Sequence, residues 1–491
     1  GDNTMQKIMR KTATAFLVLL FMLSAASCGA PAENVGSDSS ASHGGSSSSS
    51  PVSPGEPEIV DFSTYGSRWL PTHDYKTMPV GAYNSIPPAK DGYNKNFLTD
   101  EEIFKAYAEA GVNTMMGLTD YIGLNQKDVQ TALDYCYDYG LSYLIAYAGA
   151  GEVKDASNVR STLAQVMYHD SFGGIMLYDE PGRVQFENLS TARGVFEEVL
   201  EEAGDKLYHV NLFPTYATQR QLWYRNDDGT PLEKTYTYEQ YLDDFMEIYN
   251  PQVLSYDFYP IDRAFPELSN GYFENMSVIR AAALEANIPF WTFIQTCSFY
   301  TGQRLPSEAE LLWNVNTCLA YGAKGIQYFC GVNPMGNFTG SIFDREGNKT
   351  EMYDIVKSAG KMISAVDEVL MCSKSEGLLL AGVMPQLNRG EARMTIPEED
   401  LVDSYKELLS AEANHALIGC FDYNGKTALY VVNNAIADDT IVGCTAADTV
   451  KLNFEGSISG YTLNGEEKKE FSASSVSFDL GAGEGMLVVL G

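Results

Sequence analysis

The chain has 491 residues, of which 65 are acidic and 33 are basic, so its net charge at neutral pH is −32. A strongly negative surface field disfavours binding to nucleic acid and other polyanions, which leaves a neutral partner as the simplest expectation. The length suits one large domain joined to a smaller one.

Residues 1–28 are typical of a secretory leader. A basic stretch precedes an apolar run at 13–23, which is short for a membrane span. The run is followed by Ala25-Ala26-Ser27-Cys28-Gly29, which resembles the lipobox of bacterial lipoproteins, where the cysteine is lipidated. The resemblance implies an extracytoplasmic protein that is attached to the membrane only through a lipid on Cys28. Ordinary cleavage after a small residue is the alternative.

Residues 29–60 are expected to form a disordered tether rich in Ser, Gly and Pro. They contain almost no large apolar side chains and include the serine run 46–50. Such a segment cannot bury enough surface to offset its ordering entropy. The pattern of apolar runs in the remaining chain changes near residue 372, which predicts one domain over 61–372 and another over 373–491.

The segment 61–372 alternates short apolar runs with longer stretches of helical period, the pattern of βαβ units. The runs lie at 80–83, 112–118, 141–147, 174–178, 207–212, 253–256, 289–294 and 325–329. Capping boxes beginning at Thr99 and Ser307 predict helices that close at Gly111 and Gly322. Eight such units, without a Gly-x-Gly-x-x-Gly loop after the first run, favour an α/β fold of the (β/α)8 TIM-barrel type over a doubly wound sheet.

The segment 373–491 has a β pattern. Short apolar runs at 428–432, 450–454 and 486–490 are separated by turns such as Asn424-Gly425 and Asn464-Gly465. We expect an all-β sandwich packed on the barrel.

Cysteine and histidine positions give no sign of a metal or a cofactor, and none is expected. Cys136, Cys297, Cys318 and Cys330 lie in apolar segments and are predicted to be buried free thiols. His73, His169 and His209 share no metal-ligand spacing. The sequence also lacks the Gly-x-Ser-x-Gly motif that would indicate a Ser-His-Asp hydrolase.

The sharpest chemical signal is the stretch from Gly173 to Gly182, in which an apolar run leads directly into Asp179, Glu180 and Pro181. Proline and glycine end the strand, so both acids are expected at its C-terminal mouth, where barrel enzymes carry their chemistry. Neighbouring residues of a strand point to opposite faces, so only one acid should face the site squarely. Glu180 is the predicted one and Asp179 a supporting residue. The alternative is that these acids hold loops through backbone N–H groups.

A Glu-Pro pair after the fourth strand resembles the Asn-Glu-Pro motif of the TIM-barrel superfamily of retaining glycosidases that includes β-galactosidases, with Asp179 in place of Asn. Three further stretches resemble barrel glycosidases of gut bacteria; they begin at Asn211, Ser255 and Asp344. The resemblance implies a carbohydrate substrate and a general acid/base role for Glu180.

The second catalytic carboxylate is where the sequence departs from that superfamily. Its nucleophile is a Glu at the end of strand seven, whereas the run here ends in Gln295 with no acid. Asp257 follows the sixth apolar run and is the predicted substitute.

Several polar and aromatic residues are candidates for substrate binding. Asn211 and Gln295 could hydrogen-bond sugar hydroxyls, and five aromatic residues could stack on sugar rings or simply fill the barrel: Tyr83, Tyr147, Tyr259, Trp291 and Tyr328. The predicted function is hydrolysis of glycosidic bonds in neutral oligo- or polysaccharides. The alternatives are a glycan-binding surface lipoprotein on a barrel that has lost catalysis, and a purely structural barrel.

Overall fold

The computed structural model describes residues 75–90, 92–147, 149, 153–223, 235–261, 271–299, 305–384, 386–387, 395–435, 441–442, 447–465 and 467–491. The predicted leader, Cys28, the tether and His73 lie outside these residues. Within the described part of the chain, no helix has the length and apolar character needed to cross a lipid bilayer.

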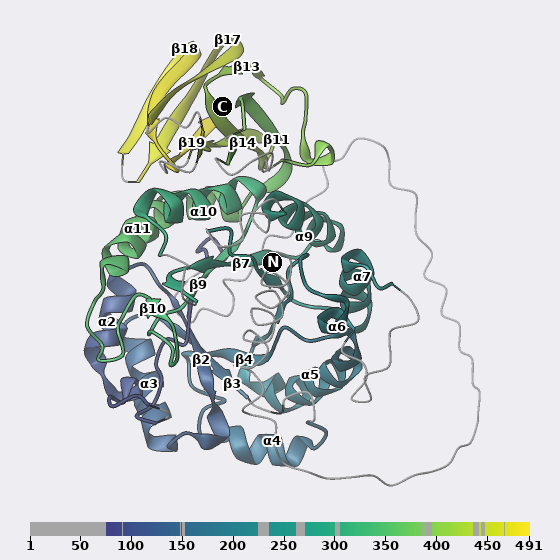
Figure 1. Cartoon of the computed structure of the whole chain (residues 1–491), viewed down its shortest axis with the longest axis vertical. Coiled ribbons are helices and arrows are strands. Elements are labelled where there is room, and N and C mark those ends of the chain that lie inside the picture. The colour runs from purple at the N-terminus through teal and green to yellow at the C-terminus, as the bar shows by residue number, and fades with distance from the viewer. Residues whose placement is uncertain are drawn as a thin grey trace, which may run out of the picture. The chain divides into compact units, whose positions relative to one another are not determined.

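Eight parallel strands close into a barrel (Figure 1). In chain order they are β1 (Val80–Tyr83), β2 (Thr114–Asp120), β3 (Ser142–Ala146), β4 (Phe172–Asp179), β5 (Leu207–Leu212), β6 (Leu254–Asp257), β7 (Phe290–Gln295) and β9 (Gly325–Phe329), and β9 pairs back onto β1. Each predicted apolar run overlaps one of these strands, so the TIM-barrel prediction is confirmed. The pattern is informative because parallel strands are covered on both faces and are therefore apolar throughout.

Helices form a ring outside the barrel (Figure 1). They are α2 (Glu101–Glu109), α3 (Gln126–Asp138), α4 (Ala156–Leu163), α5 (Phe186–Leu200), α6 (Gln219–Leu222), α7 (Tyr238–Ile248), α9 (Tyr272–Ala286), α10 (Glu308–Tyr321) and α11 (Glu351–Met371). Short 3-10 turns lie at Phe97–Thr99, Tyr121–Gly123, Arg183–Gln185 and Glu201–Ala203, and the two-residue strands β8 (Cys297–Ser298) and β10 (Thr339–Gly340) pair with each other.

Of the two predicted capping boxes, one is confirmed and one is wrong. The Ser307 hydroxyl accepts from the Glu310 backbone, Glu310 reaches back to the Ser307 backbone, and the helix ends at Gly322 in the left-handed conformation. The helix α2 forms as expected, but its N-cap is Asp100, which makes no side-chain cap bond. The Asp100 carboxylate instead forms an ion pair with Lys95, which turns it away from the helix N-terminus.

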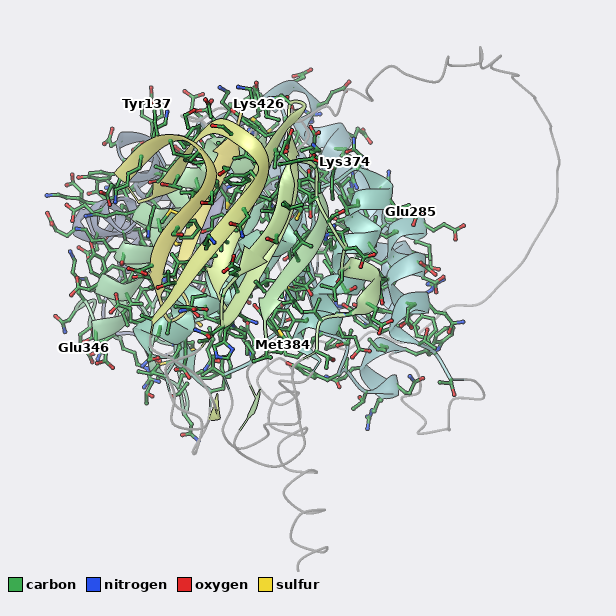
Figure 2. The ribbon with its side chains drawn as sticks, turned by 90° about the horizontal axis from the view of Figure 1, so that it is seen from above. Tyr137, Glu285, Glu346, Lys374, Met384 and Lys426 are labelled. Atoms are coloured by element: carbon green, nitrogen blue, oxygen red, sulfur yellow. The ribbon has the colours of Figure 1, made fainter. Side chains whose placement is uncertain are left out.

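The C-terminal region, predicted as an all-β sandwich, is all-β and is built on an antiparallel sheet. It contains β11 (Lys374–Gly382), β13 (Leu408–Glu412), β14 (His415–Tyr423), β15 (Lys426–Asn433), β17 (Ala447–Asn464), β18 (Glu467–Gly481) and β19 (Gly485–Leu490); β12 (Gln386–Leu387) and β16 (Ile441–Val442) form a separate pair, and a 3-10 turn lies at Glu398–Asp400. The Asn424-Gly425 turn joins β14 to β15 with both residues at positive φ, as a two-residue hairpin turn requires. Lys374 and Lys426 lie at the same end of this sheet (Figure 2).

The long strand β17 lets the sheet enclose its own core. Its register with β18 shifts between Asn453 and Ile458, and it pairs with β13 before the shift and with β19 after it. A β-bulge of this kind bends a strand and increases its twist. The resulting core contains side chains from all seven strands, among them Ile418, Val431 and Val488.

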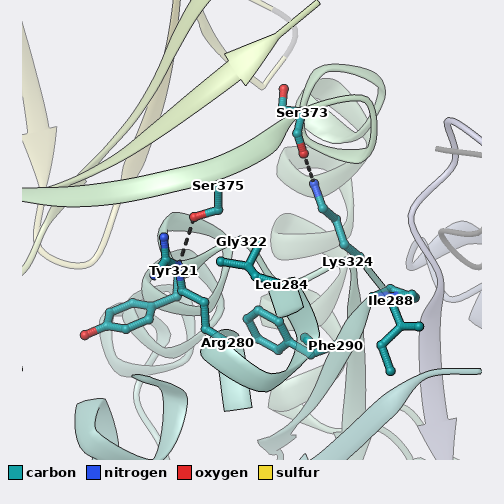
Figure 3. Close-up of a pocket in the computed structure, with 11 residues that line it drawn as sticks. Arg280, Leu284, Ile288, Phe290, Tyr321, Gly322, Lys324, Ser373 and Ser375 are labelled. Carbon is teal, nitrogen blue, oxygen red and sulfur yellow. Dashed lines mark hydrogen bonds between the residues drawn. The ribbon is translucent and has the colours of Figure 1, made fainter. Parts of the chain in front are cut away.

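The barrel and the C-terminal sheet meet through buried polar contacts. On α10, Trp313 donates to the Asn434 side chain at 2.6 Å and Asn316 donates to the Gly483 carbonyl at 2.7 Å. Around a small cavity at this junction, Arg280 donates to Ser375, and Lys324 donates to the Ser373 carbonyl (Figure 3). The four cysteines predicted to be buried free thiols are buried and unpaired: Cys136, Cys297, Cys318 and Cys330.

Candidate active site

Three acidic side chains gather at the C-terminal end of the barrel strands. Asp179 ends β4, Glu180 follows it, and Asp257 ends β6. The strand between them, β5, supplies Asn211, whose side-chain Nδ2 donates to Oδ1 of Asp179 at 3.2 Å and to Oδ1 of Asp257 at 3.0 Å. One amide therefore joins the acids of two strands that are not adjacent in the barrel.

Two backbone irregularities lie where β4 reaches this site. Met176 pairs with His209 of β5, but Tyr178 pairs with the very next residue, Val210, so β4 carries one extra residue. Such a bulge re-aims the side chains that follow it, and it sets Asp179 beside Asn211. The bulge lies before both acids, so it sets the face that Asp179 occupies, and the expectation that only one of the two faces the site squarely stays a prediction.

Glu180 has a φ of 52°, in the left-handed region that glycine favours. Its backbone N–H donates to the Asn211 carbonyl at 2.8 Å, which helps to hold this conformation. A non-glycine residue in this region costs on the order of 1 kcal/mol or more and persists only where the surroundings impose it, often at functional sites. The strained residue here is also the one that the sequence singles out as the acid.

All three carboxyl groups have raised pKa values, and burial is the largest cause for each. The pKa of Asp179 rises to about 6, although hydrogen bonds from Asn211 and Tyr83 oppose the shift. The pKa of Asp257 rises to about 8 because burial is reinforced by the charge of Asp179. The pKa of Glu180 lies well above its ordinary value because burial is reinforced by Asp257 and Asp179. The two aspartates therefore lie near enough to Glu180 for their charges to raise its pKa.

Solvent reaches these acids to different extents. Asp257 is only 8% exposed, whereas Asp179 and Glu180 are half-buried. Carboxyl groups that are close together, desolvated and unequal in pKa are the usual arrangement for acid/base chemistry near neutral pH.

Two of the predicted aromatic residues lie at this cluster. Tyr83 of β1 hydrogen-bonds Asp179, and its ring stacks on Phe329 at 5.8 Å. Tyr259 packs against Phe299 at 4.7 Å, and after burial the charge of Asp257 is the largest cause of its raised pKa. Both residues therefore stand beside the acids.

Three other predicted residues make contacts of a different kind. Tyr147 packs against Phe196 of α5, on the helix side of the barrel wall. Trp291 is 2% exposed and fills the barrel interior near His209, with ring centroids 6.0 Å apart. Gln295 is buried at the end of β7, where its amide donates to the Cys297 carbonyl.

Tyr328 is excluded from the site by strand alternation. Its neighbours on β9, Gln327 and Phe329, point into the barrel, where they contact Ser255 and Tyr83. The side chain between them must face the helices. Tyr328 is fully buried there, and its hydroxyl has no hydrogen-bond partner among the described residues.

Two residues that contact the site, Ser255 and Gln327, are not among those predicted for it from the sequence. Gln327 Nε2 donates to Ser255 Oγ at 2.9 Å, and Ser255 Oγ donates to Asn211 Oδ1 at 3.0 Å. The available signal was strand period, because Ser255 lies two residues before Asp257 and therefore shares its face of β6. A polar residue on the inner face of a barrel strand needs a hydrogen-bond partner, and the partners of Ser255 are Gln327 and Asn211.

No protein-family model matches the sequence, and no curated protein sequence matches it. Among solved structures, the chain is similar to β-galactosidase from Bacillus circulans sp. alkalophilus, with a TM-score of 0.52 and 8% identity, over 85% of this chain and 99% of that one. A second similar structure is the GH51 arabinofuranosidase from Xanthomonas axonopodis pv. citri, with a TM-score of 0.45 and 9% identity, over 85% of this chain and 96% of that one. At such identities, the likeness to the β-galactosidase shows the shared barrel fold alone.

Proposed function

We propose that this chain is a glycoside hydrolase that cleaves glycosidic bonds in neutral glycans by carboxylate acid/base catalysis. The observation that carries the proposal is the cluster of Asp179, Glu180 and Asp257 at the mouth of the barrel, with pKa values raised to different extents. Glycosidic hydrolysis requires one carboxyl group that is protonated and another that is ionised, on either side of the scissile bond.

Glu180 is the proposed general acid. It is half-buried, and burial together with the charges of Asp257 and Asp179 raises its pKa well above the ordinary value, which favours the protonated form. A facing aspartate then serves as the nucleophile or as the base that activates water. Tyr178, near the end of β4, and Tyr216, in the loop after β5, are 38% and 39% exposed and offer rings for stacking on sugars.

The shared fold with a β-galactosidase is consistent with this function but does not select it, since the same barrel carries many chemistries. The proposed site of action is outside the cytoplasmic membrane, on a lipid at Cys28. This location remains a prediction from the leader sequence, which lies outside the described residues.

The direct test is release of the chromophore or of new reducing ends from a panel of neutral 4-nitrophenyl glycosides and oligosaccharides. On any substrate that is cleaved, we expect Glu180→Gln to lower kcat by about 10³-fold, within the range for loss of a general acid. The thermal midpoint should not fall, because the change removes a carboxyl group that is unfavourably buried.

Glu310→Gln is the matched control. It makes the same substitution at a buried glutamate in the α10 capping box, where Gln can replace Glu, so activity should be retained. Full activity in Glu180→Gln would refute the assignment of the acid. Saturable oligosaccharide binding by the wild-type protein without any cleavage would instead identify a glycan-binding barrel, the function favoured by Gln295 at the end of β7.

A further inference from the structure

The orientation of the Asn211 amide is set from inside the barrel. Gln327 donates to Ser255, and Ser255 donates to the Asn211 side-chain oxygen. With its oxygen occupied in this way, the amide must turn its NH₂ group toward Asp179 and Asp257. The three residues form a relay with a fixed direction, from β9 through β6 to β5.

The two aspartates are held close together by that NH₂ group. Both accept from the same nitrogen, at 3.2 Å and 3.0 Å, so their oxygens cannot be farther apart than the sum of these distances. Bringing two buried carboxylates this near each other raises the free-energy cost of ionising both. We infer that the pair carries one proton at neutral pH.

We propose that Asp179, and not Asp257, is the ionised catalytic carboxylate that works with Glu180, and that Ser255 and Gln327 are positioning residues that hold Asn211 for it. This inference rests on the proposed function, and it revises the expectation from the sequence, which gave the second catalytic role to Asp257.

Burial decides which aspartate keeps the proton. Asp257 is 8% exposed and Asp179 is half-buried, so ionisation costs more at Asp257. Asp179 also receives a hydrogen bond from the Tyr83 hydroxyl, which favours its charged form. The same exposure lets Asp179 reach the substrate beside Glu180. Among the described residues, the titratable groups whose pKa values are raised by the charges of the pair are Glu180, which follows Asp179, and three tyrosines from other elements, Tyr83, Tyr238 and Tyr259.

In the proposed step, the Glu180 proton passes to the leaving oxygen as the bond from that oxygen to the anomeric carbon breaks. In one route Asp179 bonds to the anomeric carbon, and water then displaces Asp179 from that carbon while giving a proton back to Glu180. In the other, water bonds to the anomeric carbon directly and Asp179 takes the proton from that water. Asp257 stays protonated throughout and helps to keep Asn211 in place.

The first experiment needs no substrate. Infrared titration of protein labelled with [4-¹³C]aspartate should show, for the wild type, aspartate carboxyl steps near pH 6 and pH 8. In Asp257→Asn the upper step should vanish and the lower one should stay in place. In Asp179→Asn the lower step should vanish and the upper one should move down, because the charge that raised it has gone. The reverse pattern, or no step above pH 5, would overturn the proposal even if no glycan is ever cleaved.

The second experiment tests the relay. Ser255→Ala removes the donor to the Asn211 oxygen, so the Asp179 step should move up by about half a pH unit, and the acid limb of the kcat profile should follow it. Ser255→Thr should restore both. Ser373→Ala is the control, because it too removes a buried hydroxyl that donates a hydrogen bond. The Ser373 hydroxyl donates to the Val369 carbonyl, at the C-terminal end of α11. An unmoved step in Ser255→Ala would refute the positioning role while leaving the glycosidase proposal intact.

Discussion

Carboxyl groups are buried in two regions of this molecule, and the neighbouring charges have opposite effects on their pKa values. At the barrel mouth, nearby acids reinforce the effect of burial on the pKa values of Glu180 and Asp257. At the junction with the C-terminal sheet, Asp400 is 4% exposed, but Arg280 lies 3.1 Å away and opposes the effect of burial on its pKa. The charges at the junction offset each other, whereas those at the mouth do not.

This difference separates stability from function. A buried like-charge cluster destabilises the fold and is retained where chemistry needs it, whereas a paired charge joins two parts of the chain without a reactive group. If this view is right, removing a charge should destabilise the protein at the junction and stabilise it at the mouth.

The largest effect is expected at the junction. Arg280→Met leaves Asp400 buried without its cation, so the free energy of unfolding should fall by about 3–5 kcal/mol in urea titrations. The double variant Arg280→Met/Asp400→Leu should recover most of the loss, because no isolated charge remains. A loss below about 1 kcal/mol in the single variant, the size expected of a surface ion pair, would show that Arg280 does not offset the buried charge of Asp400.

A smaller effect of opposite sign is expected at the mouth. The pKa of Asp257 is about 8 in the folded state and near its ordinary value when unfolded, so its contribution to stability is present below pH 4 and is lost as the pH rises toward 8. Asp257→Asn should therefore lose less stability than the wild type between pH 5 and pH 8, by about 1 kcal/mol or more, in thermal melts at both pH values.

Asp448→Asn is the control for that change. The Asp448 carboxylate is also buried, but it accepts hydrogen bonds from the backbone of Asn414 and His415, so its replacement should destabilise the protein. Equal pH dependence in Asp257→Asn and the wild type would show that the mouth does not hold an unfavourable charge.

The smallest effect is expected from removing a tyrosine hydroxyl on the outer side of the barrel. Tyr328→Phe should leave kcat within about twofold and the free energy of unfolding within about 0.5 kcal/mol, as for changes away from any special feature. Tyr83→Phe, which removes the hydroxyl bonded to Asp179, should lower kcat about tenfold, the worth of one hydrogen bond to a charged group. Similar kcat values for the two variants would contradict the placement of Tyr83 in the site.

The sequence by itself determined the barrel and the position of its acids along the chain. Apolar strand runs, the Ser307 capping box and the Asn424-Gly425 turn are local signals, because period, capping and turn geometry depend on a few consecutive residues. The same local logic placed Asp179, Glu180 and Asp257 at strand ends, and therefore at one mouth.

Only the tertiary structure decided which side chains meet there. The bulge in β4 set Asp179 beside Asn211, Glu180 took a left-handed conformation, and Asn211 brought together acids from strands that do not pair. The roles of Ser255 and Gln327, and the outward direction of Tyr147 and Tyr328, follow from register and helix packing. These depend on contacts between residues far apart in the chain, about which a local pattern carries no information.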